Sequence, residues 1–381
     1  MAIGRRRRPR AAAIARYDAR ASASGATSTV RSAWRGAMED FVTRNQTPAP
    51  VPGRANWWAA LPAIIVPAVA AASGAAAGMT DRTAPAWLYP ASLAAGSADH
   101  ARTPDAPQRL PGSAQSFTAA ELTNMYRAVD WRPSSHGPLP EVVARGREPA
   151  LYACGYCHLP AGQGRPENAS LAGLPADYIV RQVASLRDGT RRAGSPSGYL
   201  PTELMIGVAR AVTDTELNAA AAYFAAQHPV RRVRVVEARE VPKSRVAGFV
   251  YVAVPGAGRE PLGRRLLEFT PDLARHEQRD DRLVYVAYAP PGSIRRGREL
   301  ARTGAGGRVA ACTGCHGTHL QGSNGIPALA GRSPSYLLRA LYQFRAGQRD
   351  GEQALPMLGV VSTLDERDLL DAVAYAASLP P

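Results

Sequence analysis

Two stretches of this chain carry apolar residues at helical spacing. In residues 175–189, PADYIVRQVASLRDG, apolar side chains recur close to every 3.6 residues, at Tyr178, Ile179, Val183 and Leu186. Residues 333–347, SPSYLLRALYQFRAG, repeat the pattern. One face of each segment can therefore be buried while the other stays in water, which predicts two amphipathic helices.

A further helix is predicted to close each of these regions. Thr213 and Asp365 each have an acidic residue three positions later, Glu216 and Asp368. This spacing resembles a capping box, in which two side chains satisfy free N–H groups at the start of a helix. We expect helices that begin at these two residues and run through Tyr223 and Tyr375.

The chain between the helical regions, residues 229–292, has a different period. Apolar and polar residues alternate in VRVVEA, in GFVYVAV and in LVYVAYA, and Pro-Gly turns follow the last two of these stretches. A period of two is typical of β-strands. We therefore expect a small β-rich insert that packs between or beside the helical regions.

The helical regions are two copies of one unit. Adding 158 to the residue number carries Cys154, Cys157, His158, Tyr178 and Gly189 onto Cys312, Cys315, His316, Tyr336 and Gly347. An offset of 152 carries Met205 onto Met357, so the first copy has a six-residue insertion before its methionine. Such a repeat predicts a mainly α fold class, with two similar helical domains separated by the insert.

The segments ahead of the repeat differ in composition. Residues 1–56 are rich in Arg, Ala, Ser and Pro, which predicts a disordered basic tail. Residues 57–79 contain an uncharged apolar run ending in small residues, which predicts a signal peptide and export to the periplasm; a retained membrane anchor is the alternative. We interpret residues 80–138 as a linker or docking segment with a short helical signal around Phe117 to Val129.

The positive charge of the chain does not indicate a nucleic-acid partner. The formal net charge is +15, but residues 1–56 contribute +8 of it, from 11 arginines against three acidic residues. The other arginines are scattered along the sequence, whereas nucleic-acid-binding proteins usually gather them in a patch or stripe.

The four cysteines carry the chemistry of each copy. They form two Cys-x-x-Cys pairs, each followed directly by a histidine, and no thiol is left for a disulfide. On a helix, positions i, i+3 and i+4 lie on one face. Two thiols at that spacing can form thioethers with the vinyl groups of one haem, while the histidine binds the iron. The motifs predict two covalently bound haem c groups, held by Cys154, Cys157 and His158 and by Cys312, Cys315 and His316.

A structural zinc site or a redox dithiol is the alternative interpretation of these motifs. Zinc needs four ligands, and taking them from both pairs would close a loop of 158 residues, unlike the short spacing of zinc ribbons. A thioredoxin-type dithiol does not need the histidine, and the βαβ pattern that accompanies it is missing. Haem is therefore favoured.

Two methionines are candidates for the sixth position of the irons. Only Met205 and Met357 follow a haem histidine; Met1, Met38, Met79 and Met125 all precede the first motif. Because the repeat aligns the two independently, iron ligation is favoured over the core packing that is usual for methionine. His/Met ligation fills both axial positions and raises the reduction potential, which predicts electron transfer without enzymatic chemistry. Surface or loop positions are expected for the histidines that have no counterpart in the other copy: His100, His136, His228, His276 and His319.

With these motifs the chain resembles class I c-type cytochromes of the tandem di-haem, cytochrome c4-like type. The resemblance covers residues 139–228 and 293–381 and implies two cytochrome c-type helical haem domains. In that family a proline ahead of a Leu-Ala-Gly element commonly offers its carbonyl to the axial histidine. Pro327 matches, whereas the first copy has Ala169 at this position, and any backbone carbonyl could serve there instead. The insert and the long front segment depart from the family pattern.

We therefore expect a periplasmic cytochrome that carries single electrons between redox proteins, such as an oxidase, a reductase or a dehydrogenase, and is not itself an enzyme. A cytochrome subunit of a periplasmic dehydrogenase complex is the alternative. A di-haem peroxidase is disfavoured because it needs one iron without a strong sixth ligand.

Overall fold

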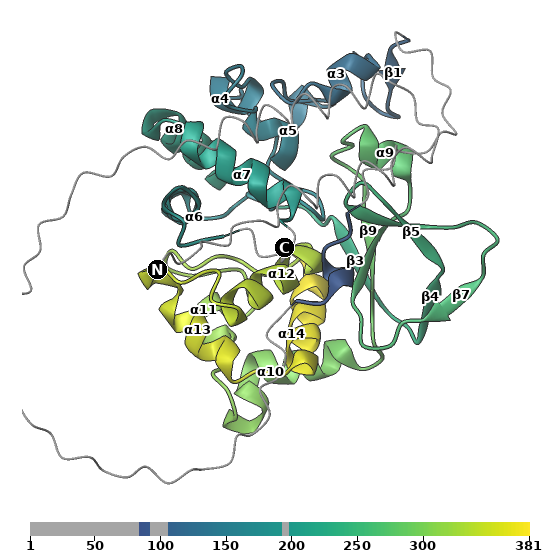
Figure 1. Ribbon diagram of the computed structural model, residues 1–381, viewed down its shortest axis with the longest axis vertical. Helices are drawn as coiled ribbons and strands as arrows, with labels where there is room; N and C mark the ends of the chain where they lie inside the picture. The colour runs from purple at the N-terminus through teal and green to yellow at the C-terminus, as the bar shows by residue number, and fades with distance from the viewer. Residues whose placement is uncertain (1–83, 92–105, 193–197) are drawn as a thin grey trace, which may run out of the picture. The chain divides into compact units, whose positions relative to one another are not determined.

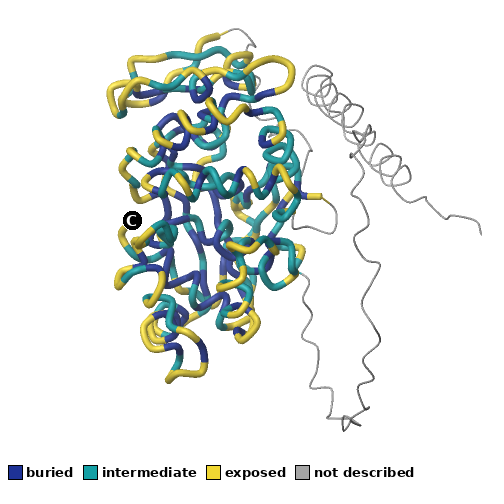
Figure 2. The backbone as a smooth tube through the Cα atoms, turned by 90° about the vertical axis from the view of Figure 1, so that its left-hand side faces the viewer, coloured by how far each residue is buried: buried dark blue, intermediate teal, exposed yellow. Residues whose placement is uncertain are grey.

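The computed structural model describes residues 84–91, 106–192 and 198–381, which belong to one compact unit, Arg82–Pro381 (Figure 1). The expectations for residues 1–56 and 57–79 lie outside the described residues and stay predictions. Within the described ranges, no helix combines the length and the hydrophobicity needed to cross a bilayer. Buried residues run through the interior of the unit, and exposed residues gather at its loops (Figure 2).

The first helical copy is built from α5 (Cys154–His158), α6 (Ala176–Asp188), α7 (Leu200–Ala211) and α8 (Asp214–Ala225). The predicted amphipathic helix is confirmed as α6, which buries Val183 and Leu186 in the core of this copy. It ends at Gly189, whose φ of 84° is a left-handed conformation that glycine adopts at little cost. The predicted capping box of Thr213 and Glu216 is confirmed at the start of α8.

The second copy is built from α10 (Ser293–Gly307), α11 (Thr313–His316), α12 (Pro334–Arg345), η3 (Glu352–Ala354), α13 (Leu355–Ser362) and α14 (Glu366–Ser378). The predicted helices are confirmed as α12 and α14, and α14 begins with the expected capping box of Asp365 and Asp368. In addition, α10 crosses α14 closely. A Cβ placed on Gly297 would lie 1.9 Å from the carbonyl oxygen of Asp371, so only glycine fits at this crossing.

The β-rich insert is confirmed. Its main sheet has the strand order β3-β9-β8-β6-β5 and consists of β3 (Val233–Glu237), β5 (Ser244–Ala247), β6 (Val250–Ala253), β8 (Leu267–Thr270) and β9 (Tyr285–Ala289). The β3–β9 and β6–β8 pairs are parallel, with Val233 opposite Tyr285 in the first. A separate antiparallel pair joins β4 (Glu240–Pro242) to β7 (Arg259–Pro261), and α9 (Leu273–Glu277) precedes β9. Val233 and Ala287 form a buried cluster with Ala377 of α14, which places the insert against the second copy.

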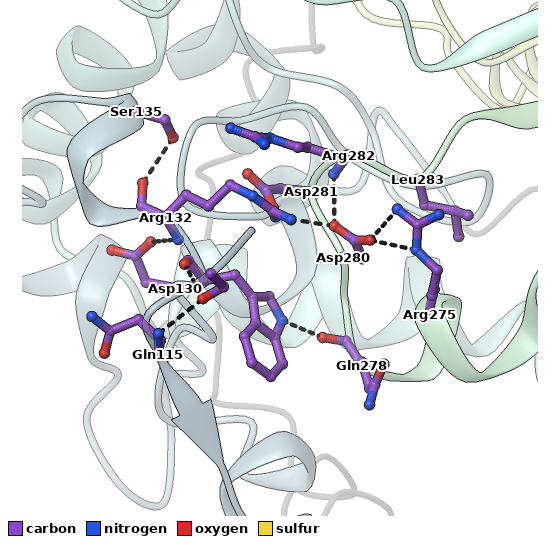
Figure 3. Close-up of polar contacts among 12 residues, drawn as sticks. Gln115, Asp130, Arg132, Ser135, Arg275, Gln278, Asp280, Asp281, Arg282 and Leu283 are labelled. Atoms are coloured by element: carbon purple, nitrogen blue, oxygen red, sulfur yellow. Dashed lines mark hydrogen bonds and ion pairs between the residues drawn. The ribbon is translucent and has the colours of Figure 1, made fainter. Parts of the chain in front are cut away.

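The segment ahead of the first copy contains η1 (Ala86–Leu88), β1 (Gln108–Arg109), β2 (Ser116–Phe117), α3 (Ala119–Thr123) and η2 (Pro133–Ser135). The next helix, α4 (Glu141–Ala144), belongs to the first copy, because Val142 and Val143 lie in its core. The helical signal predicted around Phe117 to Val129 is confined to α3. Trp131, 2% exposed, donates its indole N–H to the carbonyl oxygen of Gln278 at 2.7 Å. Beside it, Arg132 donates to Asp280 at 3.1 Å and also contacts Asp281 (Figure 3). This segment therefore packs firmly on the insert.

Replacing Trp131 by phenylalanine should lower the free energy of unfolding by about 2 kcal/mol. Trp131 packs in a small core with Leu110, Leu122 and Val129. The substitution keeps an aromatic ring in this core, but it leaves the buried carbonyl of Gln278 without its donor and removes part of the buried ring. Denaturant unfolding of the two proteins measures the difference. An unchanged midpoint would mean that this hydrogen bond does not hold the segment on the insert.

The two copies pair with each other at equivalent residues. Arg191 and Arg349, which the 158-residue offset relates, form a β-bridge, and the N–H of Arg192 donates to the carbonyl of Gln348 at 2.9 Å. Arg192 also forms an ion pair of 2.6 Å with Asp350, again its own counterpart. The copies therefore meet across a local pseudo-twofold axis at the loops that follow α6 and α12.

Candidate functional site

Both cysteine–histidine motifs lie on short helices. In the first copy, α5 holds Cys154, Cys157 and His158. In the second, Cys312 is the helical N-cap residue of α11, which holds Cys315 and His316. Because each motif is helical from its first cysteine to its histidine, the two thiols and the imidazole project from one face, as the spacing predicts. All four cysteines are free thiols.

A backbone carbonyl orients the imidazole of each motif. Nδ1 of His158 lies 2.8 Å from the carbonyl oxygen of Ala169, and Nδ1 of His316 lies 2.8 Å from that of Pro327. Because a carbonyl can only accept, Nδ1 carries the proton and Nε2 is left with a free lone pair for a metal. Burial lowers the pKa of both imidazoles, which keeps them neutral at neutral pH. The backbone of Ala169 thus takes the position that Pro327 has in the second copy.

The loop that supplies this carbonyl is built identically in both copies. The N–H of Gly164 donates to the carbonyl of His158 at 2.9 Å, and the N–H of Gly322 donates to that of His316 at 2.8 Å. These residues are again related by 158 positions. The local geometry around each histidine is therefore a repeated structural feature.

Met205 lies on α7 and Met357 on α13, and each packs against the core of its own copy. Cys154 packs against the same core as Met205, and Cys312 against the same core as Met357. Each copy therefore brings its methionine and its motif to one hydrophobic core. A thioether and a neutral imidazole are the donors that c-type haem iron accepts.

The four thiols differ in exposure. Burial raises the pKa of Cys154 to about 12 and also raises the pKa of Cys157 and Cys312, whereas Cys315 is exposed. A redox dithiol needs a low thiol pKa so that a thiolate forms at neutral pH. The environment of these cysteines therefore does not favour the dithiol alternative.

A buried group of arginines and tyrosines lies where the copies meet. This arginine cluster contains Arg191, Arg332 and Arg349 together with Tyr178 and Tyr336. Arg332 donates to the carbonyls of Ser170 and Ala172 in the other copy, at 2.7 and 3.0 Å.

The arginine cluster carries positive charge without a matching acid. Although burial raises the pKa of Tyr336, Arg191 and Arg349 outweigh this effect and lower the pKa to about 7. Among the residues that the structure describes, no carboxylate forms an ion pair with Arg191, Arg332 or Arg349. Buried cations are normally paired, so this cluster is suited to an anionic group. Sequence reasoning missed it, although the offset of 158 that relates Arg191 to Arg349 was a usable signal.

The remaining histidines follow the sequence interpretation with one correction. His228 and His319 are exposed, and His136 lies in a loop, where it contacts Asp130. His100 lies outside the described residues. His276 was expected at the surface or in a loop, but it lies on α9, is only 5% exposed and contacts the Tyr285 hydroxyl at 2.9 Å. The packing of the insert against the first copy encloses it, and nothing in the local sequence indicates that contact.

Several known proteins resemble this chain. The sequence profile of the family described as Cytochrome c matches residues 294–380. Cytochrome c4 from Azotobacter vinelandii is 25% identical over 236 residues, which cover 59% of this chain and 84% of that protein. Cytochrome c-554(548) from Halomonas halodenitrificans is 38% identical over 72 residues, 19% of this chain and 87% of that protein.

One relative is named after a redox enzyme. The thiosulfate dehydrogenase electron acceptor of Stutzerimonas stutzeri is 34% identical over 102 residues, 26% of this chain. The match spans 44% of the length of that protein.

Proposed function

Because this chain belongs to the c-type cytochrome family and is cytochrome c4-like, we propose that it is a di-haem electron carrier with one covalently bound haem c in each copy. The observation that carries the proposal is the repeated histidine geometry. Each motif histidine is held through Nδ1 by a carbonyl, presents Nε2, and shares a helix face with two free thiols.

The side chains of each copy have distinct roles in this proposal. Cys154 and Cys157, and Cys312 and Cys315, form the thioether attachments. His158 and His316 bind iron through Nε2, and Met205 and Met357 supply the sixth ligand. When bound, the haem supplies an iron that takes up and releases one electron. With a histidine and a methionine as its ligands in each copy, the iron would have no open position for substrate, and the protein would act as a carrier.

The arginine cluster fits the carboxylates that haem c brings with it. Haem carries two propionates, and Arg191, Arg332 and Arg349 are buried or half-buried without an acidic partner among the described residues. Arg191 is close enough to His158 to contribute to the lowering of its imidazole pKa, so the cluster lies beside a motif. Guanidinium groups bind carboxylates with two parallel hydrogen bonds. The cluster would therefore compensate the propionates at the junction of the copies.

The partners in this proposal are redox proteins on either side of the electron carrier. A dehydrogenase is supported as the donor, because one relative is named as the electron acceptor of thiosulfate dehydrogenase. Stable assembly with such an enzyme as its cytochrome subunit is the second candidate, favoured by the same relative. Residues 57–79 are proposed to direct export to the periplasm. Co-purification from periplasmic and membrane fractions distinguishes a free carrier from a subunit.

The haem content of the purified chain tests the proposal. We expect two haem c per chain and c-type bands in the reduced-minus-oxidised spectrum. Replacing Cys154 and Cys157 together by serine should remove one of the two covalently bound haems, and replacing Cys312 and Cys315 together should remove the other. Colourless protein, or a single haem that either double variant abolishes, would contradict the proposal.

A further inference from the structure

The insert covers the motif helix of the first copy but not that of the second. Tyr156, between the two cysteines of α5, is 4% exposed, and the guanidinium carbon of Arg279 lies 3.6 Å from its ring centroid. The equivalent position in the second copy is Gly314. A Cβ placed there would meet nothing within 4 Å, and the neighbouring Cys315 is exposed.

The backbone of Arg279 has an unfavourable conformation. Its φ of 57° is left-handed, a conformation that a non-glycine residue adopts at a cost of about 1 kcal/mol or more. Its Nε is buried without a hydrogen-bond partner. Among the described residues, no carboxylate forms an ion pair with it. The positive charge is therefore fixed over the Tyr156 ring without local neutralisation.

The groups around Arg279 do not cancel its charge. Arg165 forms an ion pair of 2.7 Å with Glu167, so that these two charges compensate each other. His276 is neutral, because burial and the nearby arginines lower its pKa well below the usual value. Arg232 donates to backbone carbonyls, among them that of Leu283 at 2.7 Å. The net charge of this group is positive.

This positive charge lies beside the cysteines of the first motif. The guanidinium of Arg279 lies over the ring of Tyr156, the residue directly before Cys157. At Gly314, the equivalent position in the second copy, an added Cβ would meet nothing within 4 Å. The two motifs therefore lie in different electrostatic environments, and the difference comes from the insert.

We propose that the insert raises the reduction potential of the first haem, with Arg279 as the positioning residue that fixes a positive charge beside the Cys157 attachment. This inference rests on the proposed haem attachment in both copies. A nearby positive charge stabilises the iron that has gained an electron. With haem bound in both copies, the charge of Arg279 would favour a single electron on the first copy over the second, with no bond made or broken and no proton exchanged. The first copy thereby stores the electron, and the second, with its exposed Cys315, exchanges electrons with partners.

Redox titration of the two-haem protein tests this inference. In Arg279→Gln, the equilibrium constant for placing the electron on the first haem should fall on the order of tenfold, which corresponds to about 59 mV for one electron. Arg279→Gly should cause the same fall without risk to folding, because glycine relieves the left-handed backbone. Arg279→Lys keeps the charge and should keep the potential. Met357→His changes the second haem and so identifies which transition belongs to it.

The matched control is Arg282→Gln, which removes the same charge from an exposed arginine of the same insert and should leave both potentials unchanged. Unchanged potentials in folded, two-haem Arg279→Gln and Arg279→Gly proteins would overturn the inference and leave the proposed function intact. An equal fall in Arg279→Lys would also overturn it, because a change of packing would then be the cause. Absence of covalent haem from the unmodified chain would overturn the proposed function, and this inference with it.

Discussion

Met205→Leu should lower the reduction potential of one haem by on the order of 0.1–0.3 V and leave the other unchanged, and Met357→Leu should do the same to the second haem. A thioether favours ferrous iron, and axial ligands account for a range of about 0.8 V among haem proteins. Leucine keeps a comparable volume in the core but has no donor atom. Spectroelectrochemical titration of each variant measures the shift.

Both variants should also bind carbon monoxide, because the sixth position is then free for an external ligand. The matched control is Met125→Leu, since Met125 is a half-buried methionine that precedes the first motif. That variant should keep both potentials and should not bind carbon monoxide. Rapid binding of carbon monoxide by the unmodified protein would instead show an open iron and would favour the peroxidase alternative.

Local signals in the sequence predicted the helical copies well because each signal is sufficient to direct local structure. The capping boxes at Thr213 and Asp365 satisfy the first turn of a helix wherever it packs, and both are present. The alternating residues of the insert likewise form strands such as β9, in which alternate residues are buried. In these segments the pattern that predicts the element is also the pattern that stabilises it.

Contacts between distant segments could not be predicted in this way. The indole of Trp131 meets Gln278 across 147 positions, and Arg279 meets Tyr156 across more than 120. No periodicity relates such residues. For this reason the expected surface or loop position of His276 was wrong, and the packing of residues 80–138 on the insert could not be predicted. The helix α10 was also not foreseen, because Gly297 and the glycines of its last turns lower its helical propensity.

The residues of the candidate site also fall into two groups, those with a signal in the sequence and those that only folding brings together. The cysteines, histidines and methionines could be predicted as site residues because each has a counterpart of the same type in the other copy. For His158 the sequence indicates only that some backbone carbonyl accepts from the imidazole. In the structure this carbonyl is that of Ala169. The arginine cluster could not be predicted because its arginines are scattered along the sequence. Only folding brings Arg191, Arg332 and Arg349 together.

Gly297→Ala should lower the free energy of unfolding by about 3 kcal/mol. Inside a helix, alanine normally stabilises the folded state by up to about 1 kcal/mol relative to glycine, so helix propensity alone predicts that the substitution stabilises the protein. The added Cβ would, however, lie 1.9 Å from the Asp371 carbonyl oxygen and 2.7 Å from the Tyr375 Cβ. Backbone atoms of α14 cannot yield as a flexible side chain would, so the overpacking cost exceeds the gain.

The clash should loosen the second copy in particular, because α10 and α14 both belong to its core. Denaturant unfolding measures the loss of stability, and haem stain of the variant should show less haem retained at Cys312 and Cys315 than at Cys154 and Cys157. Gly137→Ala is the matched control, since a Cβ there meets nothing within 4 Å and should change stability by less than about 0.5 kcal/mol. A stabilised Gly297→Ala protein would mean that the helices separate without cost, and that the α10–α14 crossing does not hold the second copy together.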